Sequence, residues 1–108
     1  MLKKELRLLS PISKKAKSFS ATEFSVKYIE NGLDKNRFGF LISKKIDKRA
    51  VVRNRAKRII RSCIEENLKN IKQGYDFLFI LNKNIIGKER DLIKKPLISA
   101  LKENNLYV

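Results

Sequence analysis

The stretch DKRAVVRNRAKRIIRS, residues 47–62, carries seven cationic side chains in sixteen positions. Its apolar residues are nevertheless regularly spaced, and on a helix of 3.6 residues per turn they fall within one arc of roughly 140°. The spacing predicts an amphipathic helix over residues 49–68 with its apolar stripe facing a core. The stripe consists of Val52, Ala56, Ile59, Ile60, Cys63 and Ile64.

The remaining circumference of this helix is basic. Arg53, Lys57 and Arg61 recur at a spacing where like charges destabilise an isolated helix by about 0.2–0.5 kcal/mol per pair. Packing of the apolar stripe outweighs this repulsion, and a bound phosphate backbone would remove it. A solvated basic face is the alternative interpretation. Arginine outnumbers lysine, however, and Asn54 lies between two arginines, so that planar groups suited to bidentate phosphate contacts are presented in a fixed array.

Composition supports a polyanionic partner. The 108 residues include 26 basic and 11 acidic side chains, a formal charge of +15, and no histidine. Nine of the basic residues and one acidic residue lie within residues 43–62, so the charge is concentrated around the predicted helix. The length and the apolar content of 43% fit one domain spanning residues 1–108. Its first part, about residues 1–20, is expected to be a basic irregular segment because Pro11 and a Ser/Lys-rich run show no periodicity.

Several function classes are disfavoured by the same composition. Without histidine there is no imidazole base or ligand, and the single Cys63 has no partner for a disulfide, a zinc site or a thiolate mechanism. We expect Cys63 to pack in the core. The absence of a long apolar run argues against membrane insertion or secretion and favours the reducing cytoplasm. An enzyme acting alone is improbable.

Outside the basic helix, alternating apolar residues predict strands at 24–29 and 37–45, and a continuous apolar run predicts a third at 75–81. Gly39 indicates a bulge or the close approach of another element. A helix is expected over about residues 88–105, where Pro96 either kinks it or lies in its first turn. The order of strand, basic helix and strand predicts an α+β fold with a β-α-β unit, for which the general rule gives a right-handed crossover.

The motif SKK, residues 43–45, followed by AVVRNRAKRIIR, residues 50–61, resembles the signature of the bacterial ribonuclease P protein component family. The signature joins a strand containing a glycine and Ser-Lys-Lys, here Gly39 and residues 43–45, to an Arg-Asn-Arg helix. ELRLLSP near the start and YDFLFIL after the helix also fit, so the resemblance covers most of the chain.

This resemblance implies an α/β sandwich with a small mixed four-stranded sheet, an N-terminal helix, and the basic helix in an unusual left-handed β-α-β crossover, against the general rule. It also implies a protein subunit that joins a catalytic RNA, the partner, and assists removal of the 5′ leader from a second partner, precursor tRNA. No cofactor would be bound by the protein alone, and Mg²⁺ would be held mainly by RNA. No residue of the chain would be catalytic, and no membrane partner is expected.

The resemblance assigns residues to two surfaces. The RNA-subunit surface would consist of Lys44, Lys45, Arg53, Asn54, Arg55, Lys57, Arg58 and Arg61. The leader surface would include Ser25 and Lys27, or Phe24 and Tyr28 if the strand register differs by one, with ordinary sheet core as the alternative for the two aromatics. Family members usually have a pair of phenylalanines before this strand, whereas this chain has a shorter segment in which Phe19 is the sole possible substitute. Lys14, Lys15 and Lys17 would then contact the leader electrostatically.

Two other functions fit part of the sequence. A structural RNA-binding protein of the ribosomal type would have a similar size and charge. A DNA-binding helix-turn-helix module would use the basic helix in the major groove, but strands rather than a short helix are predicted before residue 49.

Overall fold

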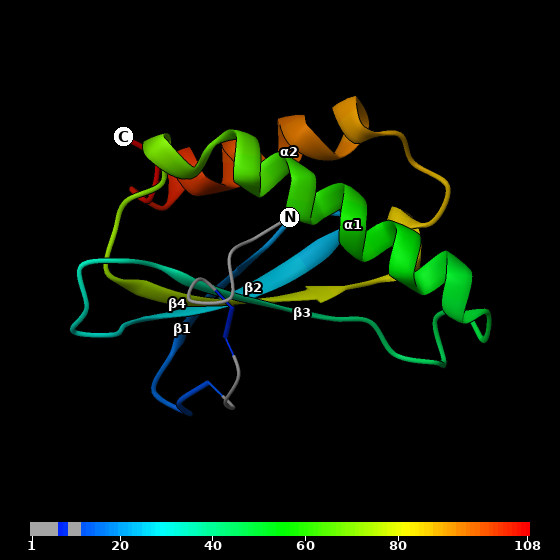
Figure 1. The fold of residues 1–108 in the computed structure, drawn as a ribbon, viewed down its shortest axis with the longest axis horizontal. Helices are drawn as coiled ribbons and strands as arrows, with labels where there is room; N and C mark the ends of the chain where they lie inside the picture. Colours follow the sequence, from blue (N-terminus) through cyan, green and yellow to red (C-terminus); the bar gives the residue numbers. More distant parts are fainter. Residues whose placement is uncertain (1–6, 9–11) are drawn as a thin grey trace.

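The protein is represented by a computed structural model that describes residues 7–8 and 12–108. Within these residues, the strands of one sheet are combined with two α-helices (Figure 1). One helix lies between the third and fourth strands along the chain, and the other follows the fourth strand. The elements are β1 Lys17–Ser20, β2 Phe24–Glu30, β3 Arg37–Leu41, α1 Ala50–Glu66, β4 Tyr75–Leu81 and α2 Arg90–Glu103, with short 3₁₀ turns η2 Leu68–Asn70 and η3 Lys83–Ile85.

The sheet is mixed, with strand order β1-β2-β4-β3. β1 and β2 form an antiparallel hairpin, and β4 inserts antiparallel to β2 and parallel to β3. The parallel pair requires a crossover connection, and α1 supplies it. The α+β fold with a small four-stranded sheet is therefore confirmed, while the hand of the crossover stays a prediction.

Both helices lie on one face of the sheet (Figure 1). Strand residues alternate between faces, and those facing the helices form an aromatic layer in which Phe38 stacks on Phe77 with ring centroids 5.4 Å apart. α1 buries Ala56, Ile60, Cys63 and Ile64 on this layer. The predicted stripe is thus the core face of α1, and its period of 3.6 is the physical reason that one side of a highly charged helix is buried.

Two expectations about element boundaries were wrong. The segment expected to be irregular up to about residue 20 contains β1, whose Phe19 pairs with Val26 and packs on Tyr28 at 5.6 Å. One apolar residue in four gives no detectable alternation, so only pairing with β2 defines this strand. The strand expected over residues 37–45 ends at Leu41.

Of the two placements expected for Pro96, the structure excludes the first turn, because Pro96 lies inside α2. Pro96 lacks an N–H and leaves a carbonyl of the preceding turn without its usual donor. Leu92, four residues earlier, is 59% exposed, so solvent can reach this part of the helix. The resemblance implies an N-terminal helix after the Arg-Leu-Leu stretch, but the described residues that follow it, 12–20, form a turn and β1 instead.

Gly39 and Cys63 behave as expected. A Cβ at Gly39 would meet Leu78 Cδ1 at 3.2 Å and Leu8 Cβ at 3.4 Å, so the glycine permits a close approach by the segment that contains Leu8. Leu8 N also donates to Phe38 O at 2.8 Å. Cys63 is fully buried, and burial raises the pKa of its thiol, which keeps it neutral and unreactive.

An ion pair secures the loop between β2 and β3. Arg37 donates through Nε and a terminal nitrogen to both oxygens of Asp76 at 2.8 Å, and Asn31 donates to Oδ1 at 3.0 Å. Burial alone would raise the pKa of Asp76, but these hydrogen bonds outweigh it and the pKa is lowered. The charges of Arg37 and Asp76 therefore neutralise each other within the protein.

Candidate nucleic-acid interface

The segment between β3 and α1 places the first cationic side chains. Ser43 Oγ accepts from Lys45 N at 3.1 Å, and this turn leaves Lys44 and Lys45 exposed. Asp47 accepts from the backbone and guanidinium of Arg49 at 2.9–3.1 Å. These hydrogen bonds lower the pKa of Asp47 to about 2. The single acid of this segment is thus engaged by its neighbour Arg49.

One row of cations on α1 faces the β3 side. Arg53 donates to the carbonyl oxygens of Asp47 and Lys48 at 2.8 and 2.9 Å, which ties the start of α1 to the preceding turn. Arg61 lies over the ring of Phe40, 5.4 Å from its centroid. Both side chains are half-buried. These two residues therefore combine a local structural contact with a cation at the surface.

A second row, formed by Asn54, Arg55 and Arg58, is exposed. Over the part of the chain that the structure describes, no carboxylate or carbonyl engages the side chains of these three residues or of Lys57. Arg55 and Arg58 line a shallow groove of about 450 Å³ with residues of α1 and with Arg90 of α2. The guanidinium groups of Arg55 and Arg58 are therefore available to bind an external anion.

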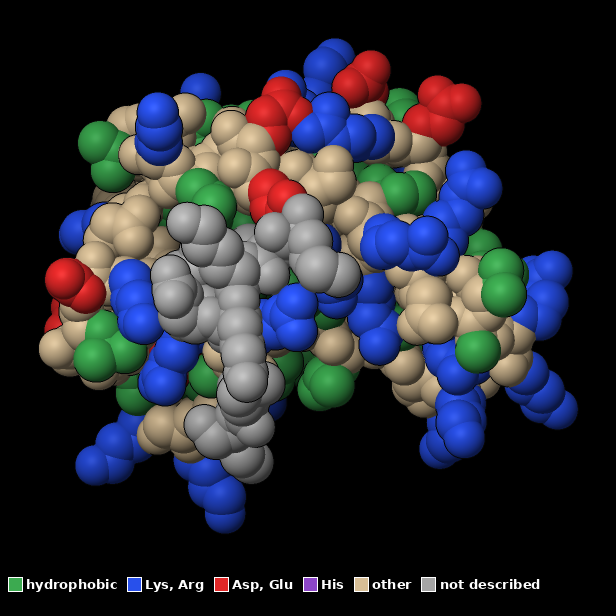
Figure 2. Space-filling view, in the orientation of Figure 1, with side chains coloured by type: hydrophobic (Ala, Val, Ile, Leu, Met, Phe, Trp, Pro, Cys, Tyr) green, Lys and Arg blue, Asp and Glu red, His purple; other side chains and the backbone are tan. Residues whose placement is uncertain are grey.

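Many basic side chains lie at one end of the molecule, and others are spread over the rest of the visible face (Figure 2). Figure 2 shows Lys and Arg crowded over the end where β3 leads into α1, whereas the acidic side chains visible in this view lie mostly along the side that carries α2. The residues predicted for the RNA-subunit surface span 17 positions of the sequence, from Lys44 to Arg61, and the structure places them at this end. It divides the arginines among them and Asn54 into the two rows described above, with Lys57 also on α1 and with Lys44 and Lys45 in the turn before it.

The residues predicted for the leader surface do not share one face. Ser25 and Lys27 point to the sheet face opposite the helices, as their register with Ile80 and Leu78 requires. Phe24 is 0% exposed and packs on Phe79 at 5.7 Å, so it belongs to the core. Tyr28 lies on the helix side, where it packs near Phe77.

Basic residues of the N-terminal segment occupy a third location. Lys14 and Lys15 are exposed in the turn before β1. Phe19 packs on Tyr28, on the helix side, so its ring does not replace a stacking platform on the opposite face. Sequence reasoning also missed Phe40 as the support of Arg61, because a contact between β3 and α1 depends on how the helix crosses the sheet.

The described residues offer no obvious metal site and no membrane-spanning helix. Over residues 7–8 and 12–108, no three His, Cys, Asp or Glu side chains gather closely enough to hold a metal ion. In the same residues neither α-helix is both long and apolar enough to cross a bilayer.

A mixed four-stranded sheet covered by two helices, one of them with an outward row of unengaged arginines, defines a small basic α+β protein of the class that binds polyanions. The chain matches the family described as Ribonuclease P over residues 2–105. It therefore belongs to the ribonuclease P protein family, whose members are accessory protein subunits of the tRNA-processing ribonucleoprotein ribonuclease P.

Individual relatives agree with this assignment. The ribonuclease P protein component of Alkaliphilus oremlandii is 34% identical over 95 residues, which cover 88% of this chain and 82% of the relative. That of Caldanaerobacter subterraneus is 39% identical over 80 residues, covering 74% and 68%. The RNase P protein from Thermotoga maritima has a TM-score of 0.77 and 28% identity, with 83% of this chain and 84% of that one covered. The RNase P protein from Staphylococcus aureus gives 0.77 and 26%, covering 99% and 95%.

The comparison confirms the predicted family and sets aside the two alternatives. The chain is an RNA-associated subunit of ribonuclease P and not a ribosomal-type structural protein. It is also not a helix-turn-helix module, because the described residues before α1 form strands and turns without a helix.

Proposed function

We propose that α1 and the turn before it bind the catalytic RNA of ribonuclease P, and that the open face of the sheet holds the 5′ leader of precursor tRNA. The RNA carries the catalytic Mg²⁺ ions in this proposal, and the protein contributes affinity and positioning. Bacterial tRNA precursors occur in the cytoplasm, the compartment in which a free buried Cys63 is stable.

One observation carries the proposal for the RNA subunit. Arg55, Lys57 and Arg58 are held in place by a helix whose opposite face is buried, while their cationic groups have no acidic partner among the described residues. A protein that used these charges for its own stability would pair them, as it does Arg37 with Asp76. A rigid cationic row that is left without partners suits the phosphate backbone of a folded RNA.

The open face supports the leader proposal through its composition. Lys27 is exposed there, and Leu78 beside it is half-buried, so an ammonium group lies next to an apolar surface. A cation here can neutralise the backbone of single-stranded RNA of variable sequence, and the apolar surface beside it can contact the bases. Because Phe24 is buried, Ser25 and Lys27 are the residues of β2 that we assign to the leader.

The test is cleavage of precursor tRNA by ribonuclease P RNA at low magnesium concentration. A protein that neutralises phosphates where RNA and substrate meet should lower the magnesium concentration needed for 5′ processing. Addition of this protein is therefore expected to stimulate cleavage most strongly where the RNA alone is nearly inactive. Equal rates with and without protein across a magnesium titration would refute the proposal.

The leader assignment needs a separate comparison. Lys27→Ala should weaken binding of precursor tRNA to the holoenzyme but leave binding of mature tRNA unchanged, since only the precursor has a leader. Lys35→Ala, in the loop between β2 and β3, is a control with the same loss of charge. If both precursor and mature tRNA lost affinity equally, Lys27 would not contact the leader.

A further inference from the structure

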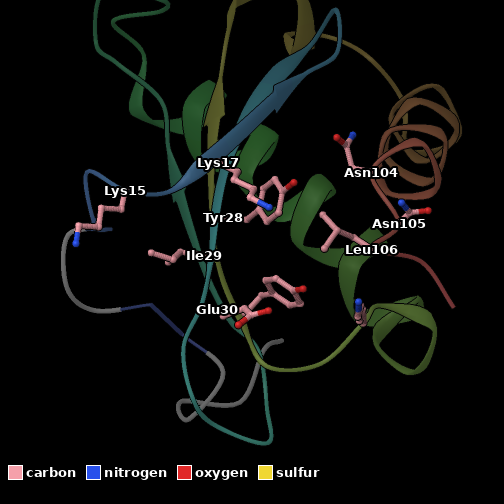
Figure 3. A pocket seen from close by; sticks show the side chains of 10 residues that line it. Lys15, Lys17, Tyr28, Ile29, Glu30, Asn104, Asn105 and Leu106 are labelled. Atoms are coloured by element: carbon pink, nitrogen blue, oxygen red, sulfur yellow. The ribbon is translucent and has the colours of Figure 1, made fainter.

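A cavity of about 500 Å³ lies apart from both surfaces described above (Figure 3). It is bounded by the start of β1, the end of β2, the segment after η2 and the chain that follows α2. It is therefore located where both helices end, whereas the cations of the proposed RNA-subunit surface lie in the turn before α1 and along that helix (Figure 1). A volume of 300–1,000 Å³ is typical of small-ligand sites. Its lining residues include Lys17, Tyr28, Glu30, Lys72, Tyr75 and Asn105.

Two tyrosines form an aromatic wall of this cavity. Tyr28 and Tyr75 have ring centroids 6.0 Å apart, and each also packs near Phe77, which is fully buried. Both tyrosines are half-buried. Within the described residues, neither phenol hydroxyl has a hydrogen-bond partner. The rings are thus fixed from the core side while part of each remains accessible, which is the arrangement required for stacking on a base.

The charge of the cavity is positive. Lys17 and Lys72 line it, and no acidic side chain of the described residues forms an ion pair with either one. Lys15 lies at the rim, and its ammonium group points away from Tyr28 in Figure 3. Glu30 is also present and offsets one of these charges. The balance still favours an anionic ligand.

The opposite wall is the chain after α2, and its backbone is held firmly. Leu106 N donates to Leu101 O at 2.8 Å, and Lys72 N donates to Leu106 O at 2.7 Å. Asn104 donates through Nδ2 to Ala100 O at 2.8 Å, and its side-chain oxygen has no partner among the described residues. Asn105 is exposed, with φ of 58°. Amide side chains of this kind can both donate to and accept from the edge of a base.

From these contacts we propose that the cavity binds one nucleotide of single-stranded RNA. The base would lie against Tyr28 and Tyr75, its polar edge toward Asn104, and its phosphate beside Lys17 and Lys72. An acidic peptide could use the lysines, but it would not use the paired aromatic rings and the amides. The inference rests on the proposed function, since it assumes that the chain works in contact with RNA. It adds a third contact, on the helix side of the sheet.

Two RNA segments could supply this nucleotide, the distal part of the leader or a single-stranded region of the RNA subunit. The double variant Lys17→Ala/Lys72→Ala should be assembled with ribonuclease P RNA and compared with Lys83→Ala/Lys95→Ala, which removes two exposed lysines outside the cavity. The measurements are binding of the RNA subunit and binding of precursors with leaders of about 5 and about 15 nucleotides.

We expect the cavity variant to lose about tenfold in affinity relative to the control in one of these measurements. A loss confined to the longer leader would identify the leader as the ligand, and a loss in assembly would identify the RNA subunit. Losses equal to those of the control in all measurements would overturn the inference. Both cavity lysines are exposed, so the fold should tolerate the change, and circular dichroism verifies this.

Glu30→Gln provides a test of opposite sign. Removal of the one carboxylate beside the phosphate position should strengthen binding by about two- to fivefold in the same measurement. A purely structural role of the cavity would give no gain, and unchanged or weaker binding would contradict the inference. The proposed function fails separately, if Arg55→Ala/Arg58→Ala binds the RNA subunit as the wild type does.

Discussion

The two helices pack on the same face of the sheet but use their charges differently. α1 presents five cationic side chains between Arg53 and Arg61 before its first acid, Glu65. α2 carries acidic as well as basic residues, and its Arg90 and Lys94 both form ion pairs with Glu66 of α1, the latter at 2.7 Å. Two helices on the same face of the sheet thus differ in surface chemistry: cations of α2 are ion-paired to α1, whereas, among the described residues, the cations of α1 are not paired to α2.

The charges of the two helices therefore have different roles: ion pairs of α2 hold the protein together, and cations of α1 are available to bind RNA. The cations of α2 that face α1, Arg90 and Lys94, share one carboxylate of the protein, that of Glu66 at the end of α1. The cations along the preceding turns of α1 repel each other in the free protein, and only a polyanion can neutralise them together. We therefore expect salt, and substitutions in α1, to affect RNA binding far more than stability.

The largest expected effect is that of salt. If α1 and the turn before it contact about six to ten phosphates, affinity for the RNA subunit should fall about 10³- to 10⁵-fold between about 50 and 200 mM monovalent salt. Filter binding across this range measures the slope. A nearly flat dependence would mean that the cations of α1 do not contact phosphates, and the contrast between the helices would lose its functional meaning.

The next effect compares the helices directly. Arg55→Ala/Arg58→Ala should weaken binding of the RNA subunit about 30- to 100-fold, at about 1–1.4 kcal/mol per lost contact. Lys94→Ala/Lys95→Ala removes the same charge from α2 and should cost less than about threefold. Equal losses would show that total charge, and not its position, determines affinity. Arg53→Ala is a poorer test, because Arg53 also binds the carbonyls of Asp47 and Lys48.

An internal ion pair should affect stability instead. Asp76→Ala removes the partner of Arg37 and Asn31 and should lower the free energy of unfolding at pH 7 by about 2 kcal/mol. The pKa of Asp76 is lowered in the folded state, so its contribution is present above the unfolded value of about 3.9 and is lost as pH falls through the folded value. Urea unfolding should therefore show a difference from wild type that shrinks in acid.

Asp34→Asn is the control for that experiment, because Asp34 is exposed in the loop between β2 and β3, which also contains Asn31. Its unfolding should match wild type at neutral pH. A deficit in Asp76→Ala that stayed constant down to pH 2 would mean that side-chain packing, and not the ionised carboxylate, stabilises this loop.

The smallest effect concerns the support of Arg61. Phe40→Leu removes the ring beneath its guanidinium group, which lies 5.4 Å from the centroid. A contact of about 0.5–1 kcal/mol corresponds to a loss of about two- to fivefold in RNA affinity. Phe19→Leu, another half-buried ring of the sheet, should leave affinity unchanged. Equal affinities of the two variants would show that Phe40 only packs against α1.

Long periodic segments were predictable. The stripe of α1 and the strand at residues 75–81 follow from local patterns, and Cys63 lies in the core because it falls inside the stripe. β1 was not predictable, because four mostly polar residues form a strand only through hydrogen bonds to β2. The side of the sheet on which Phe24 and Tyr28 lie was also not predictable, because it depends on the pairing register of β2. A shift of one residue would place both side chains on the opposite face.

The sequence by itself determined the charge, the basic flank of α1 and the family, because these depend on residue identity and short-range spacing. Only the tertiary structure decided that Arg53 and Arg61 take up local contacts while Arg55 and Arg58 remain exposed. It alone also brought Lys17, Tyr75 and Asn105 to one cavity. Such residues are far apart along the chain, and their meeting depends on strand order and on how each helix ends, which no local pattern encodes.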